Sequence, residues 1–334
     1  MLFDSIQFSI GVTLPTILLM LFGIFPRRRK FIDDTFCNMA SKVVFNFTLP
    51  PMIFLNMLKS PLDFSSQINL ISTGVGGSIL IYLWAEWWAA RHIENRRYRC
   101  IFTQGTFRTN AAILGIALIL NAYGDKALAA ASVYISCLVI TFNVLAVITF
   151  NVLAVITLTS SLSEKKVNFG RLILSILRNP LILAVIAGLT FNYFELSHQI
   201  PTPLESAGKL MASLTLPLAL ICTGASINFK QLKQFNQGVE STINKIVLFS
   251  ASIRLIFAPI FLLLLGKFVF QLPPMELGIV FVAASAPVAS ATYAMTRNYG
   301  GDGEAAANLI GITTLGSMFS ASIGLFLLRQ IGWV

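Results

Sequence analysis

Apolar segments of about 20 residues recur along the whole chain, and they limit the fold more than any other feature. A helix needs roughly 20 mostly apolar residues to cross a bilayer, and only short polar connections separate these segments. Charged residues make up 11% of the 334 residues, whereas soluble domains carry about 25%. The sequence therefore predicts an all-α polytopic membrane protein. Its ten expected transmembrane helices are residues 6–25, 35–58, 68–90, 101–123, 127–158, 173–196, 206–226, 242–266, 275–296 and 303–328.

The positive charges lie on alternate sides of the expected membrane. Most of the 24 lysines and arginines follow the first, third, fifth, seventh and ninth spans. Basic connections stay in the cytoplasm, so we expect a multi-pass plasma-membrane protein, in a bacterium the inner membrane, with both termini outside. The lipid bilayer accounts for this distribution, and the net charge of +10 is therefore not taken as a sign of nucleic-acid binding.

The two halves of the chain repeat each other. Ser41–Pro50 reads SKVVFNFTLP and Gly208–Pro217 reads GKLMASLTLP, with Lys, Thr, Leu and Pro matching at one offset of 167 residues. Five spans per repeat is an odd number, so the second repeat must insert upside down. We expect a first five-span repeat over residues 1–158, a cytoplasmic linker over 159–172 and an inverted second repeat over 173–334.

A second, shorter repeat lies inside the fifth span. Phe142–Thr149 reads FNVLAVIT, and Phe150–Thr157 reads the same again. Eight extra residues add about 12 Å and roughly 80° of rotation to a helix. We expect a longer or tilted fifth span, assign the duplication no function, and leave open whether it is tolerated.

Two spans are interrupted at corresponding places in the two halves. Thr103–Tyr123 carries Arg108-Thr109-Asn110 and then Gly115-Ile116-Ala117 at its middle, and Leu277–Met295 carries Ser285-Ala286-Pro287. Main chain that leaves a helix inside a membrane needs partners, because lipid offers none. A pair of interrupted spans in corresponding halves points to the binding site of a transporter. The fourth and ninth spans are therefore expected to be broken crossover helices.

Polar residues near these interruptions are the candidates for substrate binding. Asn110 offers an amide beside free N–H groups that attract a carboxylate, although asparagine also joins helices in membranes. Arg108 and Arg254 are charges within spans, which are functional candidates by default; Arg108 is also close enough to the surface to snorkel. Arg254 is expected to face a cavity or an ion-pair partner. We expect Asn110, Gly115 and Pro287 to shape the site, with Arg108 and Arg254 as charge partners.

Other classes of membrane protein have weaker support. An intramembrane enzyme is not expected, because the two histidines, His92 and His198, lie near connections and no metalloprotease or serine-nucleophile motif occurs. The four cysteines show no metal-binding spacing, and no cofactor or metal is implied. An anion channel would need a ring of filter residues, which nothing in the sequence indicates; it stays open as an alternative.

Five stretches carry a family resemblance, and together they cover essentially the whole chain. They read KVVFNFTLPPMIF, RTNAAILGIAL, LTLPLALICTGASI, ASAPVASATYAMTRNYGGDGEAA and ITTLGSMFSA. On these residues the chain resembles the auxin efflux carrier family, and within it the bacterial malonate or malate permeases. The family's pattern in the fourth span is Asn, five residues to Gly, and two more to Pro. Asn110 and Gly115 fit this pattern, but Ala117 stands at the proline position.

The resemblance implies a fold and a mechanism. Family members have ten spans as two inverted repeats, and their crossovers form the substrate site. It implies a secondary active transporter of a small organic anion, in which spans 3–5 and 8–10 move against spans 1, 2, 6 and 7. A sodium-coupled anion symporter of the bile-acid-transporter type is the other transporter alternative. Substrate, direction, coupling ion and oligomeric state, including a homodimer, stay open.

Overall fold

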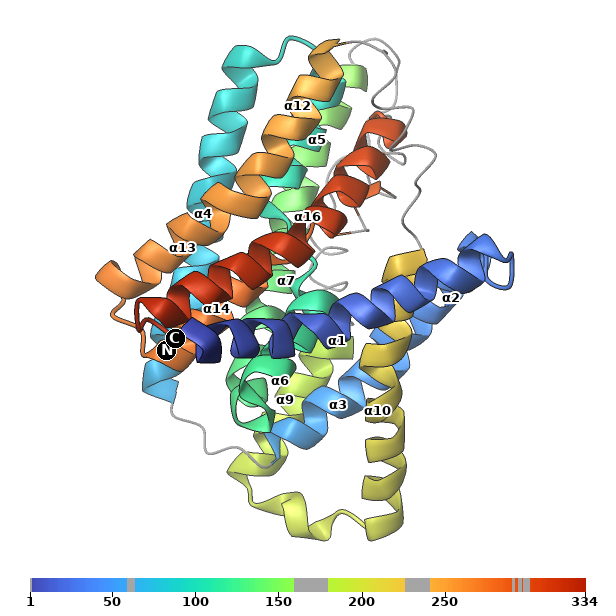
Figure 1. The fold of residues 1–334 in the computed structure, drawn as a ribbon, viewed down its shortest axis with the longest axis vertical. Helices are drawn as coiled ribbons and strands as arrows, with labels where there is room; N and C mark the ends of the chain where they lie inside the picture. Colours follow the sequence, from blue (N-terminus) through green and yellow to red (C-terminus); the bar gives the residue numbers. More distant parts are fainter. Residues whose placement is uncertain are drawn as a thin grey trace.

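The protein is helical throughout the part of the chain that the structure describes (Figure 1). The structure is a computed structural model, which describes residues 2–58, 64–158, 180–225, 241–289, 292–293, 296 and 301–334. Within these ranges no strand occurs, although Thr109 and Val288 form an isolated antiparallel bridge. The expectation of an all-α polytopic membrane protein is confirmed. The predicted linker, residues 159–172, lies outside the described residues.

The first half of the chain contains two helical regions that are not regular α-helix along their whole length. One passes through a π-helical turn between α2 and α3, and the other is interrupted between α5 and α6. The elements are α1 (Leu2–Arg28), α2 (Asp34–Val43), η1 (Val44–Thr48), α3 (Leu49–Met57), α4 (Phe64–His92), α5 (Arg96–Phe107), η2 (Ala111–Gly115), α6 (Ile116–Tyr123) and α7 (Asp125–Leu158).

The second half follows a similar course. Its eighth predicted span is continuously helical with two π-helical turns, and its ninth is interrupted after α14. The elements are α9 (Pro180–Tyr193), η3 (Leu196–Gln199), α10 (Thr202–Ala225), α12 (Ser241–Ser252), η4 (Ile253–Phe257), α13 (Ala258–Leu264), η5 (Leu265–Val269), α14 (Pro274–Ser285) and α16 (Gly303–Gln330).

Six helices within the described residues are long and apolar enough to cross a bilayer. They are Ile10–Arg28, Gln67–His92, Asp125–Ala146, Thr202–Ala225, Ile243–Val269 and Gly303–Gln330. The other predicted spans are divided into shorter helices, or lie partly outside the described residues. Ten crossings and an inverted repeat therefore stay predictions.

The helices form two groups that contact each other along α1 and also where α7 meets α3 and α9. One group contains α1, α2, α3, α9 and α10, and the other contains α4 to α7, α12 to α14 and α16. Glycines bring α1 and α10 into close contact: a Cβ atom on Gly23 would lie 2.1 Å from the carbonyl oxygen of Ile221. Small residues allow such close approach of helices in membranes. From the other side, α1 packs on α6 and α16, so it connects the two groups.

Both copies of the duplicated octapeptide are part of one helix. The helix α7 runs through both copies and has 34 residues, which is about 51 Å at 1.5 Å per residue. Phe142, Leu145 and Ala146 of the first copy are buried. The expectation of a lengthened fifth span is confirmed for the main chain.

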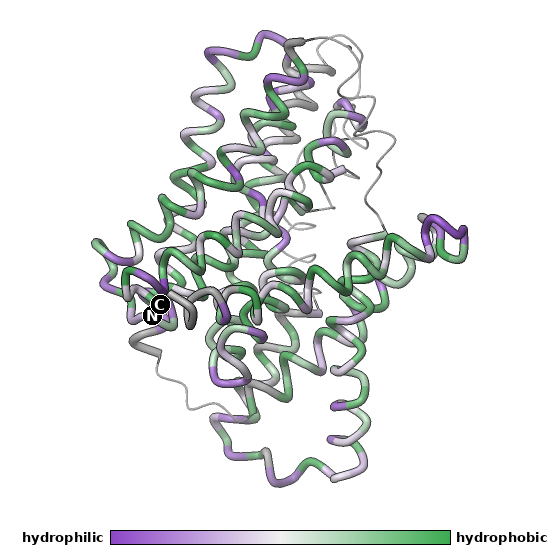
Figure 2. The backbone as a smooth tube through the Cα atoms, viewed as in Figure 1, coloured by the Kyte–Doolittle hydropathy of each residue, from purple (hydrophilic) through white to green (hydrophobic). Residues whose placement is uncertain are grey.

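Polar residues collect at the helix ends, and the two chain termini lie on one side of the molecule. Figure 2 shows hydrophobic residues along the helices and hydrophilic ones at the connections, most clearly at the turn between α1 and α2. The guanidinium carbon of Arg329 lies 4.1 Å from the centre of the Phe8 ring, which joins the ends of α16 and α1. Termini on one side of the molecule are compatible with an even number of crossings.

Candidate functional site

The first interruption lies at residues 108–110. The helix α5 ends at Phe107, and Arg108 is extended, with φ −87° and ψ 104°. The chain then resumes as the π-helical turn η2, which is followed by α6. The sequence also placed Gly115-Ile116-Ala117 in the interruption, and this was wrong: these residues are helical. Ala117, at the family's proline position, therefore continues a helix, as a residue with an N–H can.

The second interruption lies after Ser285, as the proline predicted. Ala286 is extended, with φ −62° and ψ 148°. The following Pro287 enforces this conformation, because its ring excludes the residue before it from the helical region.

The two interruptions meet inside the protein. The Asn110 N–H donates to the Pro287 carbonyl oxygen at 2.7 Å, and the Ala289 N–H donates to the Arg108 carbonyl oxygen at 3.3 Å. Thr109 and Val288 face each other between these two bonds. Each interrupted segment thus satisfies main-chain groups of the other, which a lipid environment requires.

Two threonine side chains support the crossing. The Thr109 hydroxyl lies 2.9 Å from the carbonyl oxygen of Ala283 and 3.3 Å from that of Ala286, within donating distance of both. On the other side, the Val288 N–H donates to the hydroxyl oxygen of Thr313 in α16, at 3.2 Å. Sequence reasoning missed both threonines as site residues; the position of Thr109 between Arg108 and Asn110 was the only available signal.

Arg254, in the π-helical turn η4, contacts the C-terminal ends of both interrupted helices. Its Nη1 atom donates to the carbonyl oxygens of Thr106 and Phe107, each at 3.1 Å. Its Nη2 atom donates to the carbonyl oxygen of Ala284. The sequence predicted a cavity or an ion-pair partner for this arginine, whereas the structure gives it main-chain carbonyls.

The other predicted residues lie at the same crossing. Arg108 is buried, and Asn110 is half-buried. Within the described residues, the Asn110 side chain makes no hydrogen bond, so its amide is available. Gly115 faces α14, where an added Cβ atom would lie 3.4 Å from the Ala283 Cα atom. The structure therefore brings Arg108, Asn110, Gly115, Pro287 and Arg254 together around the crossing.

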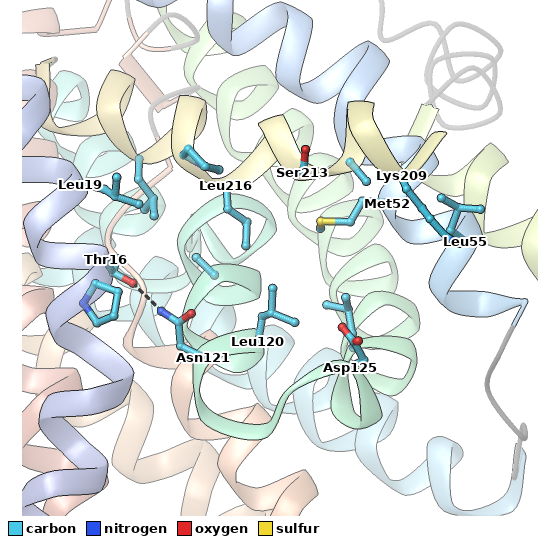
Figure 3. A pocket seen from close by; sticks show the side chains of 16 residues that line it. Thr16, Leu19, Met52, Leu55, Leu120, Asn121, Asp125, Lys209, Ser213 and Leu216 are labelled. Atoms are coloured by element: carbon cyan, nitrogen blue, oxygen red, sulfur yellow. Dashed lines mark hydrogen bonds between the residues drawn. The ribbon is translucent and has the colours of Figure 1, made fainter. Parts of the chain in front are cut away.

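A cavity of about 500 Å³ lies between the two groups of helices (Figure 3). The Asn121 side chain, from the end of α6, donates to the Thr16 hydroxyl at 3.3 Å and to the Val12 carbonyl oxygen at 3.1 Å, both in α1. Two charged residues line the cavity, Asp125 of α7 and Lys209 of α10. The Lys209 ammonium pairs with the Glu205 carboxylate at 2.8 Å. Sequence reasoning did not select Asn121 or Thr16.

An apolar layer borders this cavity toward the crossing. Met20, Leu114, Ala117, Leu220 and Ala286 pack together and are buried. Ala117 and Leu220 also line the large cavity, and Ala286 lies next to Pro287. A second cavity, of about 20 Å³, is lined by Met20, Leu114 and Ala286 of this layer and by Pro287, and it has room for about one water molecule.

Several apolar helices, two of them interrupted and joined inside the protein, define the architecture of a membrane transporter. A family model described as membrane transport protein matches residues 8–325. The match covers most of the chain, so the protein belongs to this family, the auxin efflux carrier family of permeases, and the resemblance seen in the sequence is confirmed. Members of the family are transporters rather than enzymes. No curated protein sequence matches the chain.

Proposed function

We propose that this permease is a secondary active transporter that carries a small organic anion, a carboxylate, across the plasma membrane by alternating access. The observation that carries the proposal is the crossing, where the Asn110 N–H binds the Pro287 carbonyl oxygen inside the protein. Irregular main chain within a membrane is tolerated only where it is buried in protein or lines a cavity, and it frees polar groups that an intact helix would pair internally.

The chemistry around Asn110 suits a carboxylate. The helix that begins after Asn110 has N–H groups in its first turn that no helical partner can satisfy, and its dipole is positive at that end. Helix N-termini bind anions for this reason. The available amide of Asn110 adds a donor, and the neighbouring Arg108 is the candidate charge partner.

The cavity and the apolar layer suggest how access alternates. By the distribution of basic connections, the ends of α6 and α10 at the cavity face the outside, so the cavity is an outer vestibule. The layer around Leu114 and Leu220 then separates it from the crossing. Sliding of the group that contains the crossing against α1 and α10 would uncover Asn110 to one side of the membrane at a time.

Flux measurements in proteoliposomes test the proposal. We expect saturable uptake of a labelled dicarboxylate such as malate or malonate, and counterflow when unlabelled substrate is loaded inside. Imposed proton and sodium gradients, applied separately, identify the coupling ion. Non-saturable flux without counterflow would indicate a channel, and absence of flux for dicarboxylates and monocarboxylates alike would reject the anion assignment.

A further inference from the structure

Arg254 is one of the most deeply buried side chains in the described residues, with 1% of its surface exposed. It projects from η4, a π-helical turn of the kind that often marks functional positions. Its two terminal nitrogens reach the carbonyl oxygens of Thr106, Phe107 and Ala284. The first two belong to the last turn of α5 and the third to the last turn of α14.

These carbonyls are the groups that the interruptions leave without helical partners. The last four carbonyl groups of a helix have no N–H to accept from within that helix. In a bilayer, water does not reach such groups to replace the lost bonds, and each unsatisfied group costs several kcal/mol. A guanidinium suits this task, because its planar fork holds several donors in fixed directions. An ammonium ion on a single flexible stem does not span two helix ends in the same way.

The charge of Arg254 also matches its surroundings. A helix C-terminus carries roughly half a negative charge from the aligned peptide dipoles. The ends of α5 and α14 meet at Arg254, so together they present about one negative charge to one positive side chain. This balance allows a buried arginine without a carboxylate partner, and it leaves little of the charge for a substrate anion.

We propose that Arg254 is a positioning residue that holds the C-terminal ends of α5 and α14 together and balances their dipoles. In this role it assembles the crossing and does not bind the substrate. The structural role of Arg254 does not depend on the proposed function; only the expected effect on transport rests on it. The negative charge of the substrate is then met by Asn110, the helix start after it and Arg108.

Hydrogen–deuterium exchange and transport kinetics of three variants test this inference. Arg254→Met removes the donors and the charge, and Arg254→Lys keeps the charge but loses the fork. Lys245→Met is the matched control, because it removes an exposed positive charge from α12, the helix that precedes η4. Each protein is reconstituted in nanodiscs, and exchange is measured for peptides that cover residues 104–111 and 283–289.

We expect both Arg254 variants to exchange at least about tenfold faster than the wild type in these two peptides, which is about 1.4 kcal/mol of lost protection. The exchange rates of α4 peptides should be unchanged in both Arg254 variants, and all exchange rates should be unchanged in Lys245→Met. Transport should be lost in both variants without rescue by lysine. If both variants fail to insert while Lys245→Met inserts, the positioning role is also supported, because loss of a substrate ligand does not prevent folding.

The inference is overturned if Arg254→Lys transports at near the wild-type maximal rate with a raised KM and unchanged exchange, as a substrate ligand would. The exchange experiment needs no substrate. It therefore remains decisive even if the wild-type protein transports none of the anions tested, a result that would reject the proposed function alone.

Discussion

The two interruptions at the crossing have different causes. In the second half, Pro287 forces Ala286 into an extended conformation, so local covalent structure ends α14. The first interruption contains no proline, and α5 ends at Phe107 although Arg108 and Thr109 could both continue a helix. There the end is stabilised from outside, by Arg254 on the last carbonyls and by the bond from Asn110 to the Pro287 carbonyl oxygen.

Pro287 therefore contributes to both interruptions: it ends α14, and its carbonyl oxygen accepts a bond from the Asn110 N–H of the first interruption. Pro287 fixes the extended conformation of the second interrupted segment. Main-chain groups of that segment, which have no helical partner, then bond to the first interrupted segment. Ala117, at the position of the family's first proline, lies within α6 and not at the interruption, so no proline contributes to the end of α5. The first interruption should therefore depend on distant residues, and the second mainly on its own sequence.

Apart from the Arg254 variants, the largest effect is expected from Asn110→Ala. The variant keeps the main-chain bond to Pro287 but removes the Asn110 side-chain amide, which is a candidate donor to the substrate. We expect transport to fall at least about tenfold, or 1.4 kcal/mol, with normal membrane insertion. Uptake into proteoliposomes measures this. Asn46→Ala, at an exposed asparagine in η1, is the control and should transport normally. Unchanged kinetics for Asn110→Ala would remove this residue from the site.

Pro287→Ala tests the locally determined interruption. Without the ring, residue 286 is free to become helical, so α14 can lengthen in part of the population and withdraw the carbonyl acceptor from Asn110. We expect a decrease in the maximal transport rate of roughly tenfold, since population shifts of about 1.4 kcal/mol have this effect. Pro26→Ala, inside the continuous helix α1, is the matched control. A rate equal to that of the wild type would mean that tertiary contacts hold both interruptions.

Thr109→Val tests the tertiary support of the first interruption. The two side chains have nearly the same shape, but valine cannot donate to the carbonyl oxygens of Ala283 and Ala286. Leaving buried carbonyls without a donor should lower the free energy of unfolding by about 1 to 3 kcal/mol, measured by thermal unfolding in detergent. Thr141→Val loses a bond only to a carbonyl within its own helix, so a smaller decrease is expected. Equal decreases would argue against a special role for Thr109.

The smallest effect is expected from deleting Phe150–Thr157, the second copy of the octapeptide. The packing of Phe142, Leu145 and Ala146 against the core should survive, because the helix before the deletion keeps its register. We expect insertion and transport within roughly twofold of the wild type, since length mismatch has modest costs. Loss of insertion would show that the second copy is needed to anchor α7.

Much of the architecture was predictable because it depends on local patterns. Hydrophobic length predicted the helices, and Ser285-Ala286-Pro287 correctly located the second interruption. The first interruption was placed too broadly, since Gly115 and Ala117 look like helix-breaking positions only by analogy with the family pattern. Thr313 could not be selected, because nothing beside it in the chain distinguishes it from other threonines in apolar helices.

The sequence by itself determined that this chain is a helical membrane protein of the permease class, because hydrophobic length, the proline ring and the family motifs are all properties of short stretches of residues. Only the tertiary structure decided how the crossing is held. Arg254 bonds to Thr106 and Phe107, 148 and 147 residues away along the chain, and Asn110 bonds to Pro287. A carbonyl group is present on every residue, so no sequence pattern marks which carbonyl a buried arginine or amide will find until the helices pack.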